Sequence, residues 1–352
     1  MRKIDWPSVR KVLVVRLRSI GDTVLSTPSL IALRRFLPEA HIDVLLEDWV
    51  APVLDGFDAI DRIIIAGKTS AERIGTIREL RRQRYDIAFN FHGGTTSGFL
   101  VFASGARHRI GYQEHRYSFL LSDRLSSSSE FWGREKTHSA EQQLALLGFV
   151  GVPVEDRPRS RLAVTEKASS SLQVKLNSID FKMDGPFAVI HPLAAFASKQ
   201  WAPGKFAEVI NYLHGLGIKA IAVGSKSEAD ELEALRTLCR KPFWVSGDID
   251  LPETTALLSN ANLFVGNDSG IAHMAAAVGI PTVVIFGSMN RDHWYPWTDA
   301  PAEMVFEALP CQPCPGYECK VFGDPKCILA VPVENVTAAI DRVLNSPSPP
   351  FS

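Results

Sequence analysis

Residues 263–281 carry three side chains, Asp268, Ser269 and His273, in an order that suits phosphate binding. A short apolar run comes first, then the turn-forming residues 266–270, then an alanine-rich stretch. This order predicts a buried parallel strand, a tight turn and a helix. The N–H groups and the positive dipole end at the start of such a helix favour an anion such as phosphate. An ordinary strand–helix corner with a capping side chain and a packed histidine would show the same pattern.

Lys199 and Glu228 are candidates for binding other parts of the same ligand. Lys199 follows Ser198 in a loop after a predicted strand, where its ammonium group could reach a phosphate. Most lysines in loops are, however, simply exposed. Glu228 opens a predicted helix, where its carboxylate could accept hydrogen bonds from ribose hydroxyl groups. The same carboxylate would also complement the helix dipole without binding any ligand.

Asp22 is the candidate general base. It follows the predicted strand 11–17 and lies beside Gly21, close to Arg16 and Arg18. A carboxylate at such a strand end can accept a proton from a substrate hydroxyl group. From the local sequence alone, a helix N-cap is the more frequent role of an aspartate in this setting.

Four of the five cysteines are clustered late in the chain. Cys311, Cys314, Cys319 and Cys327 have the spacing C-x2-C-x4-C-x7-C. Four thiols this close could bind a structural zinc ion, and reduced, unliganded or redox-active thiols are the alternative. The pattern does not indicate a catalytic role.

The elements that must position these side chains alternate between strands and helices in the first half of the chain. Predicted strands cover residues 11–17, 41–46, 62–65 and 85–91, and predicted helices cover residues 23–37, 71–84 and 138–147. Polar residues 126–137 predict a mobile loop. Alternating strands and helices imply a parallel sheet with helices on both faces. Ligands of such sheets bind at the carboxyl ends of the strands, where residues 19–22 and His92 fall.

The second half of the chain restarts the same alternation. Predicted strands cover residues 187–191, 220–223, 263–265 and 282–286, and predicted helices cover residues 206–216, 228–240 and 252–259. Prolines and charges in residues 151–161 indicate the approach to a domain boundary. We therefore expect two α/β domains of doubly wound, Rossmann-like type, covering residues 1–175 and 176–352.

The composition limits the classes of partner and of compartment. The chain has 352 residues, 46% of them apolar, and a net charge of −1, so no nucleic-acid partner is expected. Residues 1–180 hold 26 Lys+Arg and 21 Asp+Glu, a net of +5, and the remainder has a net of −6. This asymmetry suits an acidic substrate or an anionic membrane surface, or is only a solvated imbalance. No apolar run approaches the ~20 residues of a spanning helix, and no signal peptide is indicated, so a cytoplasmic location is expected.

Two common nucleotide-binding motifs are missing from the chain. The turn after residues 11–17 lacks the G-x-G-x-x-G pattern of dinucleotide-binding folds, and no G-x4-G-K-S/T loop is present. A Rossmann oxidoreductase and P-loop chemistry are therefore disfavoured.

Taken together, these residues resemble the ADP-heptose:lipopolysaccharide heptosyltransferases, which are the family 9 glycosyltransferases. The resemblance covers most of the chain, and its marks in the first half are residues 16–22, Thr27-Pro28, 104–107, 110–111 and His138. Its marks in the second half are residues 199–201, 224–228, 268–270, His273, 275–276 and 286–287. Two positions depart from the family pattern. Leu193 stands where glycine is usual, and His92 where glutamine is more usual.

The resemblance implies a GT-B fold and an inverting transfer of heptose from ADP-heptose to the lipopolysaccharide inner core, without a cofactor or metal. Asp22 would be the general base in the first domain, with Arg18, Ser19, Gly21 and His92 on the acceptor side. The second domain would bind the donor through Ser198, Lys199, Glu228, Asp268, Ser269, Gly270 and His273. Lys199 would contact the diphosphate, Glu228 the ribose and Asp268 the sugar, while Ser269, Gly270 and His273 would contact the phosphates. The acceptor, a lipid A-linked core, would bring the protein to the cytoplasmic face of the inner membrane as a peripheral protein.

Three alternatives share much of this pattern. One is a glycosyltransferase of the same fold with a different nucleotide-sugar donor. Another is a protein that binds a nucleotide sugar without catalysis. The third is a sugar-nucleotide epimerase, which would need no lipid acceptor.

Overall fold

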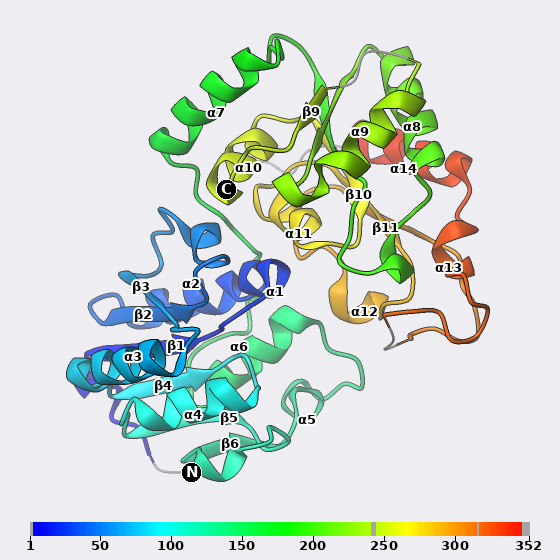
Figure 1. Cartoon of the computed structure of the whole chain (residues 1–352). Coiled ribbons are helices and arrows are strands. Elements are labelled where there is room, and N and C mark those ends of the chain that lie inside the picture. Colours follow the sequence, from blue (N-terminus) through cyan, green and yellow to red (C-terminus); the bar gives the residue numbers. More distant parts are fainter. Residues whose placement is uncertain (1–2, 241–243, 315–316, 347–352) are drawn as a thin grey trace. The chain divides into compact units, whose positions relative to one another are not determined.

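The structure of the chain is a computed structural model that describes residues 3–240, 244–314 and 317–346 (Figure 1). The chain divides into two compact units, Met1–Ser160 and Arg161–Ser352. The sequence had suggested a division after residue 175, which lies inside helix α7 (Glu166–Ser178). That helix is held to the second unit, because Lys175 Nζ lies 2.8 Å from Glu253 Oε2 and Ser171 Oγ donates to the same carboxylate. The two units therefore separate before α7 rather than within it.

The first unit contains a six-stranded parallel sheet in the order β3-β2-β1-β4-β5-β6. Its strands are β1 (Lys11–Val15), β2 (His41–Leu46), β3 (Arg62–Ile65), β4 (Ile87–Asn90), β5 (His108–Tyr112) and β6 (Asp123–Leu125). Its helices are α1 (Ile20–Val24), α2 (Thr27–Phe36), α3 (Ser70–Gln83), α4 (Thr95–Ala103), α5 (Ser128–Trp132) and α6 (Ser139–Phe149), with the 3-10 turns η1 (Trp6–Ser8), η2 (Ala51–Leu54) and η3 (Ser118–Leu120). Helix α2 packs against α6, and α3 against α4.

The second unit contains another six-stranded parallel sheet, in the order β12-β11-β10-β7-β8-β9. Its strands are β7 (Phe187–His191), β8 (Lys219–Val223), β9 (Trp244–Ser246), β10 (Leu263–Asn267), β11 (Thr282–Phe286) and β12 (Ala302–Phe306). Its helices are α7, α8 (Pro203–Gly215), α9 (Ala229–Leu238), α10 (Leu251–Ser259), α11 (Gly270–Ala277), α12 (Arg291–Trp294), α13 (Lys326–Leu329) and α14 (Val333–Asn345), with the turns η4 (Ala197–Lys199) and η5 (Lys226–Glu228).

Both sheets have the same topology. When the strands of the second unit are counted from β7 and read from the other edge, their order is also 3-2-1-4-5-6. This is the order of doubly wound nucleotide-binding folds, in which the strand order reverses between strands 1 and 4. The reversal lies between β1 and β4 in the first unit and between β7 and β10 in the second. These two points are where a ligand of each unit is expected.

The strands next to each reversal are buried on both faces. Every residue of β10 is buried, as is every residue of β7, and β1 is buried from Val12 onward. Such strands read as continuous apolar runs because helices cover both sides of the sheet. Polar residues are found instead where these strands end, which places them at the reversal points.

Several elements differ from the sequence-based expectation. The predicted helix over residues 23–37 is two helices, α1 and α2, because Pro28 sits in the first turn of α2 and favours a new helix start there. Residues 126–137, expected to form a mobile loop, contain helix α5, which Ser127 caps. The first half also contains α4, β5 and β6, which alternation of apolar residues did not reveal.

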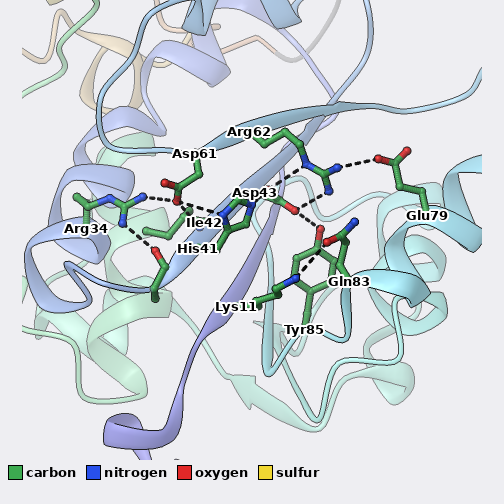
Figure 2. Close-up of polar contacts among 11 residues, drawn as sticks. Lys11, Arg34, His41, Ile42, Asp43, Asp61, Arg62, Glu79, Gln83 and Tyr85 are labelled. Carbon is green, nitrogen blue, oxygen red and sulfur yellow. Dashed lines mark hydrogen bonds and ion pairs between the residues drawn. The ribbon is translucent and has the colours of Figure 1, made fainter.

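A polar network surrounds a buried carboxylate near the amino ends of the strands of the first sheet (Figure 2). Asp43 of β2 is fully buried and accepts hydrogen bonds from Tyr85 Oη at 2.5 Å and Arg62 Nη2 at 2.9 Å. His41 Nε2 lies 2.9 Å from its other oxygen. Burial and the Asp43 carboxylate together raise the pKa of the Tyr85 hydroxyl, so the phenol remains a donor. This network ties β2, β3 and the start of β4 together at the end of the sheet opposite to the strand ends that precede Asp22 and His92.

Within the described parts of the chain, no helix is both long and apolar enough to span a bilayer.

Candidate functional site

The turn between β10 and α11 has the predicted strand–turn–helix geometry. Ser269 is the N-cap of α11, and its Oγ accepts a hydrogen bond from the Ala272 N–H at 3.4 Å. Gly270 is the first residue of the helix, so its N–H belongs to the group that has no partner within a helix. The positive end of the α11 dipole thus lies at the reversal point of the second sheet, where it can attract an anion.

Lys199 and Asp268 lie at this same point and contact each other. Lys199 ends the turn η4 that follows β7, and its Nζ lies 2.8 Å from Asp268 Oδ2. Both side chains are largely buried, with 14% and 5% of their surface exposed. The sequence placed them near each other only on the assumption that β7 and β10 are neighbours. The sheet order shows that they are.

Ser198 holds η4 against the strand end of β11. Its Oγ accepts a hydrogen bond from Ser288 Oγ at 3.1 Å, and its carbonyl accepts from the Ser288 N–H at 3.3 Å. Glycine is required at position 287, because a Cβ there would lie 2.2 Å from the Ser198 carbonyl oxygen. The loop that carries Lys199 is therefore fixed by close backbone contact.

His273 lies one turn into α11 and is buried, with 5% of its surface exposed. Its ring centroid is 6.4 Å from that of Trp294 in α12, at a tilted angle.

Glu228 lies farther along the sheet, after β8, where its carboxylate accepts hydrogen bonds at 2.7 Å from both the N–H and the Oγ of Ser225. In this structure Glu228 thus stabilises its own turn, and it remains half-buried at the strand ends.

Two residues that the sequence analysis did not single out organise this region. His191 ends β7, and its Nδ1 lies 3.1 Å from Ser269 Oγ. Burial lowers the pKa of His191 to about 4, so its imidazole is neutral at physiological pH. Asn267 ends β10 and bridges to the segment that follows β7. It accepts a hydrogen bond from the Trp201 N–H and donates one to the Pro192 carbonyl oxygen. The sequence feature that could have identified both residues is a polar side chain at the carboxyl end of a buried strand.

Asp22 occupies the corresponding place in the first unit. It is the third residue of α1 and forms a capping box with Ser19, whose Oγ donates to Asp22 Oδ2 at 2.8 Å. Arg16 forms an ion pair with the other carboxylate oxygen. The Asp22 side chain is 21% exposed, so it remains accessible to solvent. The N-cap of α1 is Ser19 and Asp22 is its third residue, so Asp22 supports the cap without being the N-cap itself. Its role as general base stays a prediction.

His92 and Arg18 lie at the end of the neighbouring strands. His92 Nδ1 is 3.1 Å from the Arg18 carbonyl oxygen. Burial and the nearby Arg16 guanidinium lower the pKa of His92. His115 lies next to it, against Gly93, and burial lowers its pKa to about 4. Asn90 Oδ1 accepts from the Gly93 N–H and fixes this turn. Neither Asn90 nor His115 was predicted.

The predicted residues therefore form two groups, one in each unit. In the first unit Arg18, Ser19, Asp22 and His92 gather where β1 and β4 end, and Gly21 is buried within α1. In the second unit Ser198, Lys199, Asp268, Ser269, Gly270 and His273 gather where β7 and β10 end, with Glu228 after β8.

The four late cysteines do not form a metal site in the described chain. Cys311, Cys314 and Cys319 are half-buried, Cys327 is buried, and all four are free thiols. Burial raises the pKa of the Cys327 thiol. Among residues 3–240, 244–314 and 317–346, no three His, Cys, Asp or Glu side chains form a group that could hold a metal ion. The geometry gives the zinc interpretation no support.

Comparison with known proteins identifies the family. The family model described as glycosyltransferase family 9 (heptosyltransferase) matches residues 73–323, which is more than half of the chain. The chain belongs to glycosyltransferase family 9. Its enzymatic class is accordingly that of a glycosyltransferase.

Relatives of this family 9 protein match it over nearly its full length. It is 27% identical to lipopolysaccharide heptosyltransferase 3 of Escherichia coli, over 94% of this chain and 98% of that protein. The solved structure of a family 9 glycosyl transferase from Veillonella parvula superposes with a TM-score of 0.81 at 21% identity, covering 95% of this chain and 97% of that one. The structure of E. coli ADP-heptose lipopolysaccharide heptosyltransferase II gives 0.78 at 22% identity, covering 95% and 98%. These likenesses and the two parallel sheets identify the fold as GT-B, built from two Rossmann-like domains.

Proposed function

We propose that this family 9 glycosyltransferase moves a heptose from ADP-heptose to the inner core of lipopolysaccharide, with inversion at the anomeric carbon. The observation that carries the proposal is the pair of residue groups at equivalent points of two sheets with the same topology. One group contains a solvent-accessible carboxylate, Asp22, and the other contains a lysine and a helix N-terminus. The family match and the names of the relatives support heptose as the transferred sugar and a lipopolysaccharide core as the acceptor.

Asp22 is the proposed general base. Inversion needs an acceptor hydroxyl group that attacks the anomeric carbon from the face opposite to the leaving ADP, and a base that takes the hydroxyl proton as the new bond forms. The hydrogen bond from Ser19 and the ion pair with Arg16 fix the carboxylate in one orientation. Such fixation lowers the entropy cost of aligning base and hydroxyl group. Arg18 and His92, at the neighbouring strand ends, are proposed to contact the acceptor.

The second unit is proposed to bind the donor. As the glycosidic bond breaks, negative charge builds up on the β-phosphate of ADP. The Lys199 ammonium group and the N-terminus of α11, with Ser269 and Gly270, are placed to stabilise that charge. Ser198 fixes the loop of Lys199, His273 adds a donor one turn along α11, and Asp268 is proposed to hold the sugar hydroxyl groups. Glu228, after β8, is proposed to accept hydrogen bonds from the ribose.

We propose that no divalent ion is needed, because Lys199 and the helix N-terminus supply the positive charge that a metal would bring to the diphosphate. The reaction would take place at the cytoplasmic face of the inner membrane, where a lipid A-linked acceptor would be met.

The test is incubation with ADP-heptose and a panel of truncated lipopolysaccharide cores, with the product mass followed over time. A gain of one heptose residue on one core, with the anomeric configuration opposite to that of the donor, is the expected result. Binding of ADP-heptose without any product on any core would show a non-catalytic binding protein. Transfer only from another nucleotide sugar would refute the choice of donor.

A further inference from the structure

Helix α4 of the first unit begins with Thr95, Thr96 and Ser97, and from Phe99 to its end it is apolar on both of its faces. It contains no charged residue, and Leu100 and Val101 on one face pack into the core beneath α3 and α4. The opposite face carries Phe99 and Phe102, which are 49% and 44% exposed. A helix that is hydrophobic all round is normally buried in a protein core or in contact with a membrane. The outer face of α4 is therefore a candidate for contact with a membrane or another molecule.

Two further aromatic side chains extend this face. Tyr117 and Phe119, beside and within η3, are 38% and 71% exposed, and their rings lie 5.9 Å apart. The turn η3 packs along α4, where a Cβ on Gly98 would lie 3.5 Å from the Tyr117 Cβ. We call Phe99, Phe102, Tyr117 and Phe119 the aromatic patch. Contiguous exposed apolar surface of this kind marks an interaction site more often than scattered single residues do.

A hollow of about 250 Å³ opens beside the patch, between α3 and α4. Its lining includes Arg73 and Ile77 of α3 together with Phe99 and Tyr117. The two helices lie side by side in Figure 1, and Arg81 of α3 joins them by donating to the Ala103 carbonyl oxygen at 3.0 Å. The hollow thus has aromatic walls on one side and a guanidinium group on the other.

The surroundings of the aromatic patch are rich in arginine. Residues 70–119 contain eight arginines and four carboxylate residues, whereas the whole chain has a net charge of −1. Arg73, Arg81 and Arg116 are exposed, and Arg109 lies over the Phe102 ring at 5.7 Å. Exposed aromatic rings inside a rim of arginines match the boundary of an anionic bilayer, where rings enter the headgroup–acyl boundary and guanidinium groups contact phosphates.

We propose that the aromatic patch and its arginines form a docking surface for a bilayer that contains anionic phospholipid. The inference deepens the proposed function, because an acceptor anchored in a membrane requires the enzyme to work at that surface. Charge complementarity decides the choice of partner. A second copy of the same surface would bring two sets of arginines together, which repels, whereas an anionic bilayer neutralises them.

The test is sedimentation of the whole protein with vesicles, without donor or acceptor. The protein should bind vesicles of phosphatidylglycerol mixed with phosphatidylcholine, and binding should weaken in high salt and vanish on phosphatidylcholine alone. Phe119→Ser and Phe99→Ser should each weaken binding, whereas Phe322→Ser, at an aromatic side chain of the second unit that is 45% exposed, should not. Phe119 is the safer variant, because its ring is 71% exposed and contributes little to the core.

The electrostatic half of the proposal has its own variants. Arg73→Glu and Arg116→Glu should each reduce vesicle binding by at least about five-fold, the effect of removing roughly one basic contact with an anionic surface. Lys167→Glu, at an exposed position of α7, is the matched control and should bind like the unmodified protein.

Three results would overturn the inference: no binding to anionic vesicles, equal loss in the control variants, or a dimer in solution that Phe99→Ser dissociates. The outcome is independent of the reaction assay. If no core accepts heptose, the vesicle-binding result still supports or contradicts the docking surface. If transfer is found, Phe119→Ser should leave transfer to a deacylated, soluble core unchanged.

Discussion

Lys199 Nζ and Asp268 Oδ2 are 2.8 Å apart, so two side chains expected to bind different parts of one donor form an ion pair with each other. Neighbouring strands β7 and β10 deliver them to the same point at the N-terminus of α11. A diphosphate that binds there must compete with Asp268 for the lysine. The ion pair holds the lysine in place before the donor arrives, at some cost in affinity.

This competition predicts opposite effects at the two residues. Lys199→Met should weaken ADP binding by roughly 10- to 100-fold, the loss of a charge-assisted hydrogen bond. Asp268→Asn should strengthen ADP binding several-fold, because it releases the lysine from the ion pair. It should also slow transfer, because the sugar hydroxyl groups lose the carboxylate that is proposed to hold them. Calorimetry with ADP measures both. Lys219→Met, which removes the Lys219–Asp184 ion pair, is the control and should leave ADP affinity unchanged. Equal weakening in Asp268→Asn would contradict the competition.

Replacement of the proposed base should separate chemistry from donor binding. Asp22→Asn keeps the shape of the side chain and its contact with Ser19 but cannot take a proton. Transfer should fall by about 100-fold or more, while ADP affinity, which we propose to depend on the second unit, should stay within about two-fold. Asp156→Asn, which loses only an exposed ion pair with Arg35, should transfer normally. Near-normal turnover by Asp22→Asn would rule out this residue as the base.

The buried His191 predicts a loss of stability in mild acid. Its pKa is about 4 in the folded protein, below the ordinary value of 6.5, so the unfolded chain binds the proton first as the pH falls. The free energy of unfolding should therefore decrease from about pH 6.5 down to about pH 4, by up to about 3 kcal/mol from this residue. Urea unfolding across this range compares the protein with His191→Gln, which cannot titrate. If the free energy of unfolding depends on pH in the same way in both proteins, His191 is not responsible for the loss of stability.

The network of Figure 2 should matter for stability and not for ligand binding. Asp43→Ala leaves Arg62 and the Tyr85 hydroxyl without their buried partner, and we expect a loss of roughly 3–5 kcal/mol in the free energy of unfolding. Glu79→Gln removes only the exposed partner of Arg62 and should cost less than about 1 kcal/mol. ADP affinity of the folded fraction should be unchanged in both. A selective loss of ADP affinity in Asp43→Ala would place the network in the site.

Removal of divalent ions tests the source of positive charge at the diphosphate. With EDTA in excess, the rate of transfer should stay within about two-fold of the untreated rate if Lys199 and the α11 N-terminus supply the positive charge, as proposed. Loss of activity that added Mg²⁺ restores would mean that a bound ion takes part. Lys199→Met should lower the rate of transfer both with and without EDTA.

The sequence by itself determined the strands that flank both reversal points and where polar residues follow them, although it did not reveal β5, β6 or β12. Continuous apolar runs such as residues 187–191 and 282–286 match β7 and β11, because a strand covered on both faces must be apolar throughout. The turn residues 266–270 predicted a helix from Ile271 onward, and α11 begins one residue earlier, at Gly270, since turn and capping preferences act over a few residues.

Only the tertiary structure decided which strand ends meet. The order of strands brings Lys199 to Asp268 across 69 positions of sequence and adds His191 and Asn267, whose roles depend on neighbours that local patterns do not specify. It also places the Arg16–Asp22 ion pair beside His92 of a different strand. Local preferences fix elements, whereas contacts between elements depend on how their apolar faces pack, and that packing is a property of the whole domain.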